Sequence, residues 1–189
     1  DMGVLRSLPG ITLLEPSDPV MVQDLMEQLV EPYGMYYLRL FRKSALRIYQ
    51  DGSHFEIGKG VVVREGHDAT IIAAGIMVAE AIRAAELLQA EGLSVRVVDM
   101  FTWKPIDKEL IGRCAEETGA IVTAENHNQL GGLYAAVAEV VVASRPVPME
   151  AVGTDDRFGQ VGTEAFLRKA YGLMPEDIAE RVRRAVARK

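Results

Sequence analysis

Short apolar runs alternate with helical stripes along most of the chain. From residue 57 onward, runs typical of buried strands occupy residues 61–63, 69–74, 95–100, 120–124 and 149–152. Between them, apolar residues recur at helical spacing, as they do after Gly75 at positions 78, 81, 82, 85 and 88, which leaves Glu80 facing outward. Strands that alternate with helices predict a three-layer α/β/α domain with a mostly parallel sheet of about five strands.

Capping residues support several of these helix boundaries. Asp107 can cap one helix and Gly119 can end it, while Gly131 and Gly132 open the next. Cys114 falls on the inward stripe of the helix after Asp107, which favours a small buried apolar side chain over a catalytic thiol. Two amphipathic helices, around residues 166–167 and 178–186, complete the chain.

The first 43 residues predict an incomplete α/β unit. Residues 11–14 fit a buried strand, and Asp18 can cap a helix with Pro19 in its first turn. Apolar positions 22, 25, 26 and 29 predict the inward face of that helix, and residues 35–41 predict a second strand. Two strands and one helix cannot cover each other's apolar faces. We therefore expect this fragment to be mobile or to bury apolar surface against another copy, in a dimer.

The regular pattern stops between the fragment and the α/β domain. Residues 44–56 are mixed polar and basic, with a probable turn at residues 51–53. We therefore divide the chain into an incomplete fragment (1–43), a linker (44–56) and an α/β domain (57–189).

Composition and charge exclude several classes of protein. With 49% hydrophobic and 25% charged residues the chain is of ordinary globular composition, and no apolar run is long enough to span a bilayer. The formal net charge of −6 argues against nucleic-acid binding. A lone cysteine suits a reducing cytoplasm, and residues 1–10 lack the features of a secretory signal. We expect a cytoplasmic protein with neither a membrane nor a nucleic acid as partner.

Chemical motifs of the common kinds are absent from the sequence, but several longer segments are informative. The sequence has no phosphate-binding loop, dinucleotide loop or paired metal-ligand motif. Seven segments of residues 58–162 resemble, in order, the C-terminal domain of the transketolase family: GKG (58–60), REGHD (64–68), GIM (75–77), FTWKPID (101–107), AENH (124–127), GG (131–132) and DDRFGQVG (155–162). Three earlier segments resemble the end of that family's pyrimidine-binding domain: LRSLPG (5–10), EPSD (15–18) and YLRLFR (37–42).

The resemblance implies an enzyme and its cofactors. Transketolases use thiamine diphosphate and Mg²⁺ to transfer a two-carbon ketol unit between sugar phosphates, and the family pattern puts the catalytic and cofactor-binding residues upstream of this segment or in another domain. The resemblance thus implies no catalytic, cofactor-binding or metal-binding residue in this chain, and the chain alone is expected to be inactive. It implies a homodimer, a complementary N-terminal transketolase subunit, or both, and a first strand that runs antiparallel to the rest of the sheet.

Arg42 is the residue that the resemblance assigns to substrate binding. By resemblance it grips the terminal phosphate of the sugar, whereas the residues alone also allow a solvated arginine at a strand end. Arg39 lies three positions earlier on the same predicted strand, so we expect it on the opposite face, in a structural role. Glu125 and His127 follow a strand at its carboxyl end, where they either form a secondary site or cap the next helix, and capping is favoured.

Three alternatives to a transketolase are open from the sequence. Deoxyxylulose-phosphate synthases share short sequence segments with this chain, such as residues 64–66. The β subunits of 2-oxoacid dehydrogenases share the expected fold. Residues 37–42 do not resemble the corresponding segment of the dehydrogenases, and Phe158-Gly159 is closer to the transketolases than to the synthases. The third alternative is a noncatalytic module that serves only dimerisation.

Overall fold

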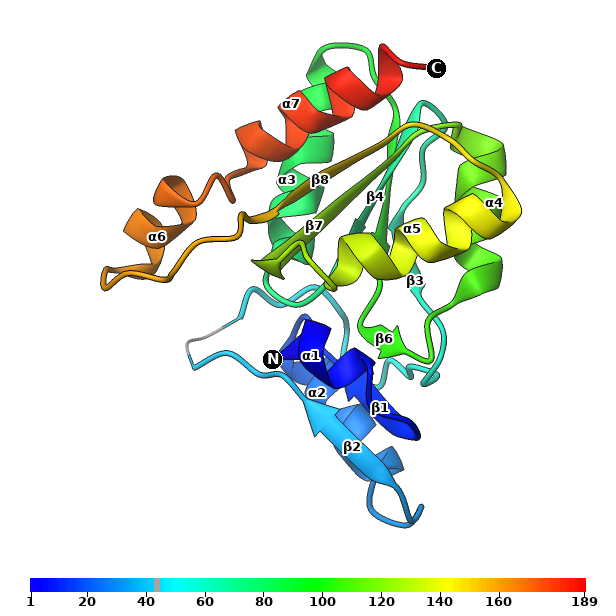
Figure 1. Ribbon diagram of the computed structural model, residues 1–189, viewed down its shortest axis with the longest axis vertical. Helices are drawn as coiled ribbons and strands as arrows, with labels where there is room; N and C mark the ends of the chain where they lie inside the picture. The colour runs from blue at the N-terminus through cyan, green and yellow to red at the C-terminus, as the bar shows by residue number, and fades with distance from the viewer. Residues whose placement is uncertain (43–44) are drawn as a thin grey trace.

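The computed structural model describes residues 1–42 and 45–189 and has a three-layer α/β/α core (Figure 1). Its central sheet has five strands in the order β3-β5-β4-β7-β8. Their bounds are Val61–Arg64 (β3), Ala69–Ala73 (β4), Val95–Asp99 (β5), Ile121–Asn128 (β7) and Met149–Thr154 (β8). Helices α3 (Met77–Ala90) and α7 (Pro175–Val186) pack on one face, and α4 (Lys108–Thr118) and α5 (Leu133–Ser144) on the other. The predicted fold class is confirmed.

The direction of the strands also agrees with the expectation. β3 pairs with β5 in antiparallel fashion, and all other neighbours in this sheet are parallel. β5 and β7 flank β4 on opposite sides, so the chain order reverses between β4 and β7. The carboxyl ends of these two strands therefore form the switch point where open α/β sheets bind ligands.

Local chemistry sets the helix ends much as the sequence predicts. The side chain of Asp107 accepts a hydrogen bond from the Leu110 N–H at 3.0 Å, and Gly119 ends α4 with a φ of 66°. The prediction for Glu80 was wrong, because this side chain is buried rather than outward. Arg83 and Arg168 both donate to it, and these charge-assisted bonds allow a carboxylate to leave water.

A second, three-stranded sheet joins the N-terminal fragment to the rest of the chain. Its order is β2-β1-β6, formed by Met35–Leu38, Ile11–Leu14 and Thr102–Lys104, with β1 parallel to β2 and antiparallel to β6. β6 was not predicted, and it lies within residues 101–107, one of the segments that resemble the family. A short helix, α1 (Met2–Arg6), was also not predicted. The fragment thus completes its sheet with a strand from the α/β domain.

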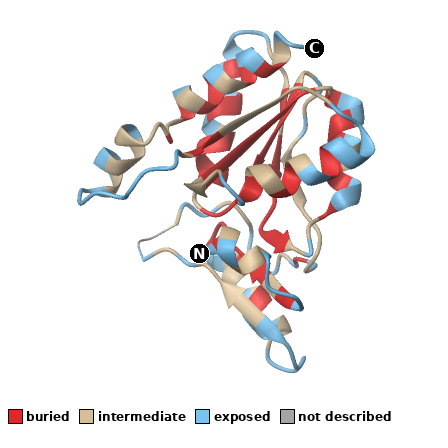
Figure 2. Cartoon of the chain, in the orientation of Figure 1, coloured by how far each residue is buried: buried red, intermediate tan, exposed pale blue. Residues whose placement is uncertain are grey.

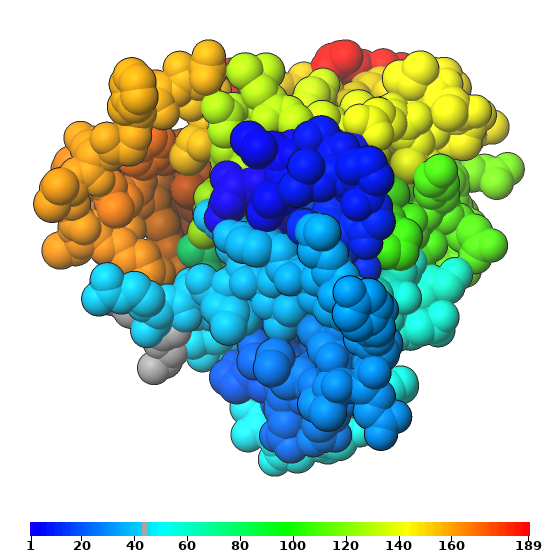
Figure 3. All heavy atoms as spheres, turned by 60° about the horizontal axis from the view of Figure 1, so that its bottom comes forward, coloured from blue at the N-terminus to red at the C-terminus, as the bar shows by residue number. Residues whose placement is uncertain are grey.

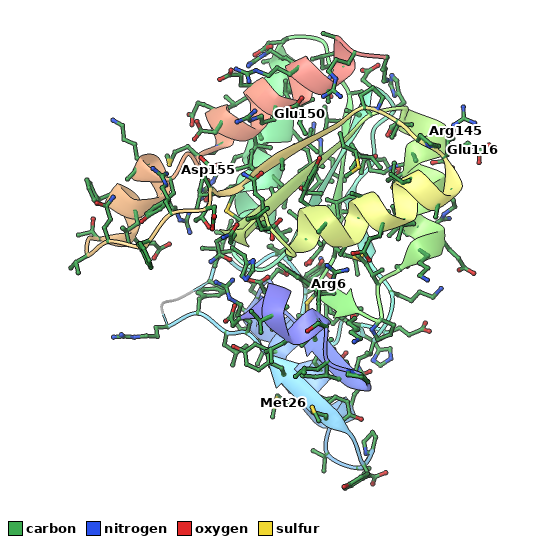
Figure 4. The ribbon with its side chains drawn as sticks, viewed as in Figure 1. Arg6, Met26, Glu116, Arg145, Glu150 and Asp155 are labelled. Atoms are coloured by element: carbon green, nitrogen blue, oxygen red, sulfur yellow. The ribbon has the colours of Figure 1, made fainter. Side chains whose placement is uncertain are left out.

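The apolar surface of the fragment is covered by the rest of the chain only in part. Leu14 and two residues of α2 (Pro19–Gln28) pack in one cluster with Phe55 and Phe101. This packing turns α2 away from its predicted orientation: Met21 is fully buried, while Met26 is 50% exposed (Figure 4). The fragment therefore combines buried with exposed segments (Figure 2). Its exposed large apolar residues are Val4, Leu8, Met26, Val30, Tyr33, Met35 and Leu40, so the expected association through this surface stays a prediction.

The predicted linker packs against both parts of the chain. The boundary predicted between residues 43 and 44 lies outside the described residues, but residues 45–56 carry no helix or strand. Asp18 caps α2 through the Met21 N–H at 2.9 Å, and its other oxygen accepts the N–H groups of Ile48 and Tyr49, each at 2.9 Å. One carboxylate therefore fixes both the start of the helix and the path of the linker.

We predict that Asp18→Ala destabilises the chain more than the loss of an ordinary helix cap. Removing the carboxylate leaves three N–H groups without their partner, so the free energy of unfolding should fall by about 2–4 kcal/mol. Thr163→Ala is the control because Thr163 caps only the Phe166 N–H, and it should cost about 1 kcal/mol or less. Urea unfolding measures both, and equal losses would contradict the double role of Asp18.

Candidate functional site

A pocket of about 580 Å³ lies at the switch point of the central sheet. Its lining comes from the chain after β2, from the ends of β4, β7 and β8, and from residues 160–173. The residues that line it are Phe41, Arg42, Ile76, Asn126, Thr154, Gln160, Gly162, Thr163, Glu164, Leu167, Arg168, Tyr171 and Leu173. The N-terminal fragment and the α/β domain thus build this pocket together.

Arg42 is exposed and lines this pocket. β2 ends at Leu38, earlier than predicted, so Arg39 and Arg42 do not share a strand and their faces do not follow from alternation. The two side chains differ in their surroundings. Arg42 is exposed at the pocket, whereas Arg39 forms an ion pair with the buried Glu15. The two side chains thus differ in their contacts, although not through alternation along one strand as predicted, and the role of Arg42 in substrate binding stays a prediction.

Arg39 ties the fragment to the carboxyl end of the central sheet. Its guanidinium forms an ion pair with the buried Glu15 and donates to the Asn126 side chain at 2.5 Å and to the Asn126 carbonyl at 3.1 Å. A further ion pair joins its Nε to Asp1 at 3.4 Å. Because Phe41 and Arg42 follow directly, this joint fixes where the chain enters the pocket.

The backbone and the side chain of Glu15 both contact Gly75. Its carbonyl accepts the Gly75 N–H at 3.2 Å, and its side chain lies against Gly75, where a Cβ would come within 2.8 Å of Oε1. Gly75 also has a φ of 53°, so both space and backbone require glycine here. Burial raises the pKa of the Glu15 carboxyl, and the Arg39 guanidinium acts against that rise.

Glu125 caps a helix, as the favoured interpretation predicted. It lies inside β7 rather than in a turn, and it accepts the N–H groups of Leu133 at 2.7 Å and Tyr134 at 2.8 Å in the first turn of α5. The side chain is fully buried, and this burial raises its pKa to about 8 although the two N–H donors favour the charged form.

His127 belongs to the contact between α1 and β7. Its Nδ1–H donates to the Asn128 carbonyl at 2.7 Å, and its Nε2 accepts the Gly3 N–H at 3.4 Å. The ring lies edge-on to Trp103, with 5.8 Å between ring centroids. Burial lowers the pKa of His127, which agrees with the neutral tautomer that these two bonds require. Glu125 and His127 therefore both make structural contacts, and it is Asn126, between them, that lines the pocket.

A third buried carboxyl, Asp99, lies at the end of β5. Its Oδ2 accepts the hydroxyl groups of Ser17 at 2.5 Å and Tyr49 at 2.8 Å. Burial raises the pKa of Asp99 to about 7, and the neighbouring Asp18 and Glu15 carboxylates add to that rise. Sequence reasoning missed Glu15, Asp99 and Asn126 as partners; two of them lie in segments quoted for the resemblance, but no local pattern assigns them contacts.

We predict that these buried carboxyls make the chain less stable as the pH rises from 6.5 to 8.5. Burial raises the pKa of Asp99 from the ordinary 3.8 to about 7 and that of Glu125 from 4.5 to about 8. Between the ordinary and the raised pKa of each group the folded state binds more protons than the unfolded state, so the free energy of unfolding falls as the pH rises. His127 has the opposite sign, but its lowered pKa confines its effect to below its ordinary value of 6.5. Urea unfolding at several pH values measures the slope.

The variant Glu125→Gln should reduce this slope because it removes one of the carboxyl groups whose pKa burial raises. Glu109→Gln is the matched control, since the Glu109 side chain is 85% exposed, and it should keep the wild-type slope. If the free energy of unfolding stays level or rises across the window in the wild type, the raised pKa values are wrong.

Comparison with known proteins assigns the chain to a family. The profile described as "Transketolase, C-terminal domain" matches residues 58–178. A curated relative from Clostridium sp. (strain MSTE9), the 6-deoxy-6-sulfo-D-fructose transketolase subunit SqwH, is 41% identical over 100% of this chain and 59% of its own length. The putative transketolase C-terminal section of Methanocaldococcus jannaschii is 37% identical over 96% of this chain and 58% of its own length.

A solved structure agrees with these relatives. It is described as "Split gene transketolase, inactive beta4 tetramer" and superposes with a TM-score of 0.97 at 41% identity, covering 100% of this chain and 62% of the other. The chain thus spans less than two thirds of the length of the relatives it matches. On the match of residues 58–178 and on the close likeness of fold and sequence, the chain belongs to the transketolase family, of which it carries the C-terminal domain.

Proposed function

We propose that this chain is the C-terminal part of a thiamine-diphosphate-dependent transketolase that transfers a two-carbon ketol unit between sugar phosphates. The observation that carries the proposal is the exposed guanidinium of Arg42 at a pocket on the switch point of the sheet, in a chain of this family. The role of the chain is assembly and the binding of the terminal phosphate of the substrate, while the chemistry requires the remainder of the enzyme.

The chemistry of Arg42 suits a phosphate anchor. A guanidinium is charged at every physiological pH and offers two parallel N–H groups to two oxygens of one phosphate, which an ammonium cannot imitate. The Arg39 joint supports the backbone just before it, so the side chain starts from a fixed point. Arg42 lines a pocket and is exposed there, so a ligand can reach it, whereas Arg39 is already paired with Glu15.

The diphosphate and Mg²⁺ of the complete enzyme do not fit the residues of this chain. Magnesium that binds a diphosphate is held by one or two protein carboxylates together with phosphate oxygens and water, and the diphosphate needs a phosphate-binding loop, a motif that this sequence lacks. In residues 1–42 and 45–189, no three or more His, Cys, Asp or Glu side chains are grouped so that they could hold a metal ion. We therefore assign the cofactor site to the complementary part of the enzyme.

The proposed organisation follows the family resemblance. Residues 1–43 are the end of the pyrimidine-binding domain, 44–56 are the linker and 57–189 are the C-terminal domain. Relatives that are named as a subunit or a C-terminal section, and a solved relative described as a beta4 tetramer, support a complementary N-terminal subunit and association between copies of this chain.

No helix in the described part of the chain is long and apolar enough to cross a membrane. We assign the enzyme to the cytoplasm.

Arg42→Ala in the complemented enzyme tests the phosphate anchor. We expect the Michaelis constant for phosphorylated sugars to rise by the equivalent of about 2–4 kcal/mol, because a charge-assisted, two-point contact is lost. The rate with glycolaldehyde, an unphosphorylated acceptor, should change little. Arg39→Ala is the control: it breaks the joint with Glu15 and Asn126, so it should lower stability and affect all acceptors alike. Equal effects of Arg42→Ala on both kinds of acceptor would exclude the anchor role.

A second experiment tests the assignment of the cofactor site to the rest of the enzyme. Calorimetry with thiamine diphosphate and Mg²⁺ should show negligible binding to the 189-residue chain alone, because it lacks a grouped set of metal ligands in its described residues. Adding the complementary subunit should restore binding. Micromolar affinity of the isolated chain would contradict the split site.

A further inference from the structure

An arm formed by residues 155–170 projects from the domain between β8 and α7 (Figure 1). It consists of a loop, which starts at Asp155 beside the end of β8 (Figure 4), and the helix α6 (Glu164–Ala170). None of the residues of α6 is buried. A segment that buries so little of itself contributes little hydrophobic stabilisation to its own domain.

Large apolar side chains of the arm are exposed to solvent. Phe158 and Val161, in the loop, are each 99% exposed, and Phe166, in α6, is 51% exposed. The arm is attached to the domain through a charged group, because Arg168 donates to the buried Glu80 at 2.5 Å, while its bond to Glu164, at 2.6 Å, lies within α6. Exposed large apolar side chains that gather in one segment indicate an interaction surface. We call Phe158, Val161 and Phe166 the arm face.

The backbone that carries the arm face is held in place. The guanidinium of Arg157 stacks on the Tyr171 ring, 4.3 Å from its centroid, and donates to the Ala170 carbonyl at 2.9 Å. The Tyr171 hydroxyl donates to the Phe158 carbonyl at 3.0 Å. These contacts fix the main chain of Phe158 while its ring is left in solvent. Such preorganisation lowers the entropic cost of association.

We propose that the arm face is an interface between two copies of this chain. The inference rests on the proposed association of copies and names its surface. Charge favours a copy as the occupant: the arm holds three acidic and three basic residues, whereas the whole chain has a net charge of −6. Two copies of an acidic chain repel each other, and a neutral face lets them meet with the least repulsion. A two-fold contact brings a patch against itself, which mixed charges permit and charges of one sign oppose.

A matched pair of valine variants tests this interface. Val161→Asp puts a charge in the arm face, whereas Val142→Asp makes the same change on α5, where Val142 is 73% exposed. We expect sedimentation of the 189-residue chain to show self-association, and Val161→Asp to raise the dissociation constant by about tenfold or more. Val142→Asp should stay within about twofold of the wild type. Both side chains are exposed, so circular dichroism should show intact folding.

Three results would overturn the proposal. One is a wild-type chain that stays monomeric at all concentrations measured. Another is an equal effect of both variants on self-association. The third is normal self-association of Val161→Asp with weakened binding to the complementary subunit, which assigns the arm to that partner. Sedimentation reports mass and not activity, so a complemented enzyme without ketol transfer would refute the proposed function and leave this interface standing.

Discussion

The joint between Arg39, Glu15 and Asn126 is the constraint on which the rest of the molecule depends. Glu15 is 4% exposed. A buried carboxylate without a charged partner would lower the stability of the fold by roughly several kcal/mol. Arg39 supplies that partner from the fragment and reaches the carboxyl end of β7 through Asn126. The two sheets are therefore held in one relative position, which the apolar clusters alone would fix less strictly. In the space-filling view the N-terminal segment lies directly against the rest of the chain (Figure 3).

Polar groups concentrate where the two sheets meet. Glu15 follows β1, Asp99 ends β5 and Glu125 lies in β7, and all three are buried. Their oxygens accept hydrogen bonds from other parts of the chain, among them the linker through Tyr49 and α5 through the Leu133 N–H. A shift in the pairing of β1 with β6 would move Glu15 from its partner, so these bonds select one register.

Assembly and substrate binding use neighbouring parts of this fold. The arm that presents the exposed Phe158 and Val161 also supplies Gln160, Thr163 and Leu167 to the pocket that Arg42 lines. An ion pair between Arg168 and Glu80 attaches the arm to α3, and none of the residues of α6 is buried. Covering the outer face of the arm would therefore hold the pocket wall on its inner side, and this links association of copies to the shape of the candidate site.

The sequence by itself determined the α/β order, the strands of the central sheet and the caps at Asp18, Asp107 and Gly119, because these depend on neighbours within one or two turns. Family resemblance added Arg42 and the antiparallel β3. Only the tertiary structure decided the pairing of β1 with β6, the burial of Met21 and Glu80, and the contacts of Arg39. Each of those depends on a partner far away along the chain, and such partners leave no periodic trace in the sequence.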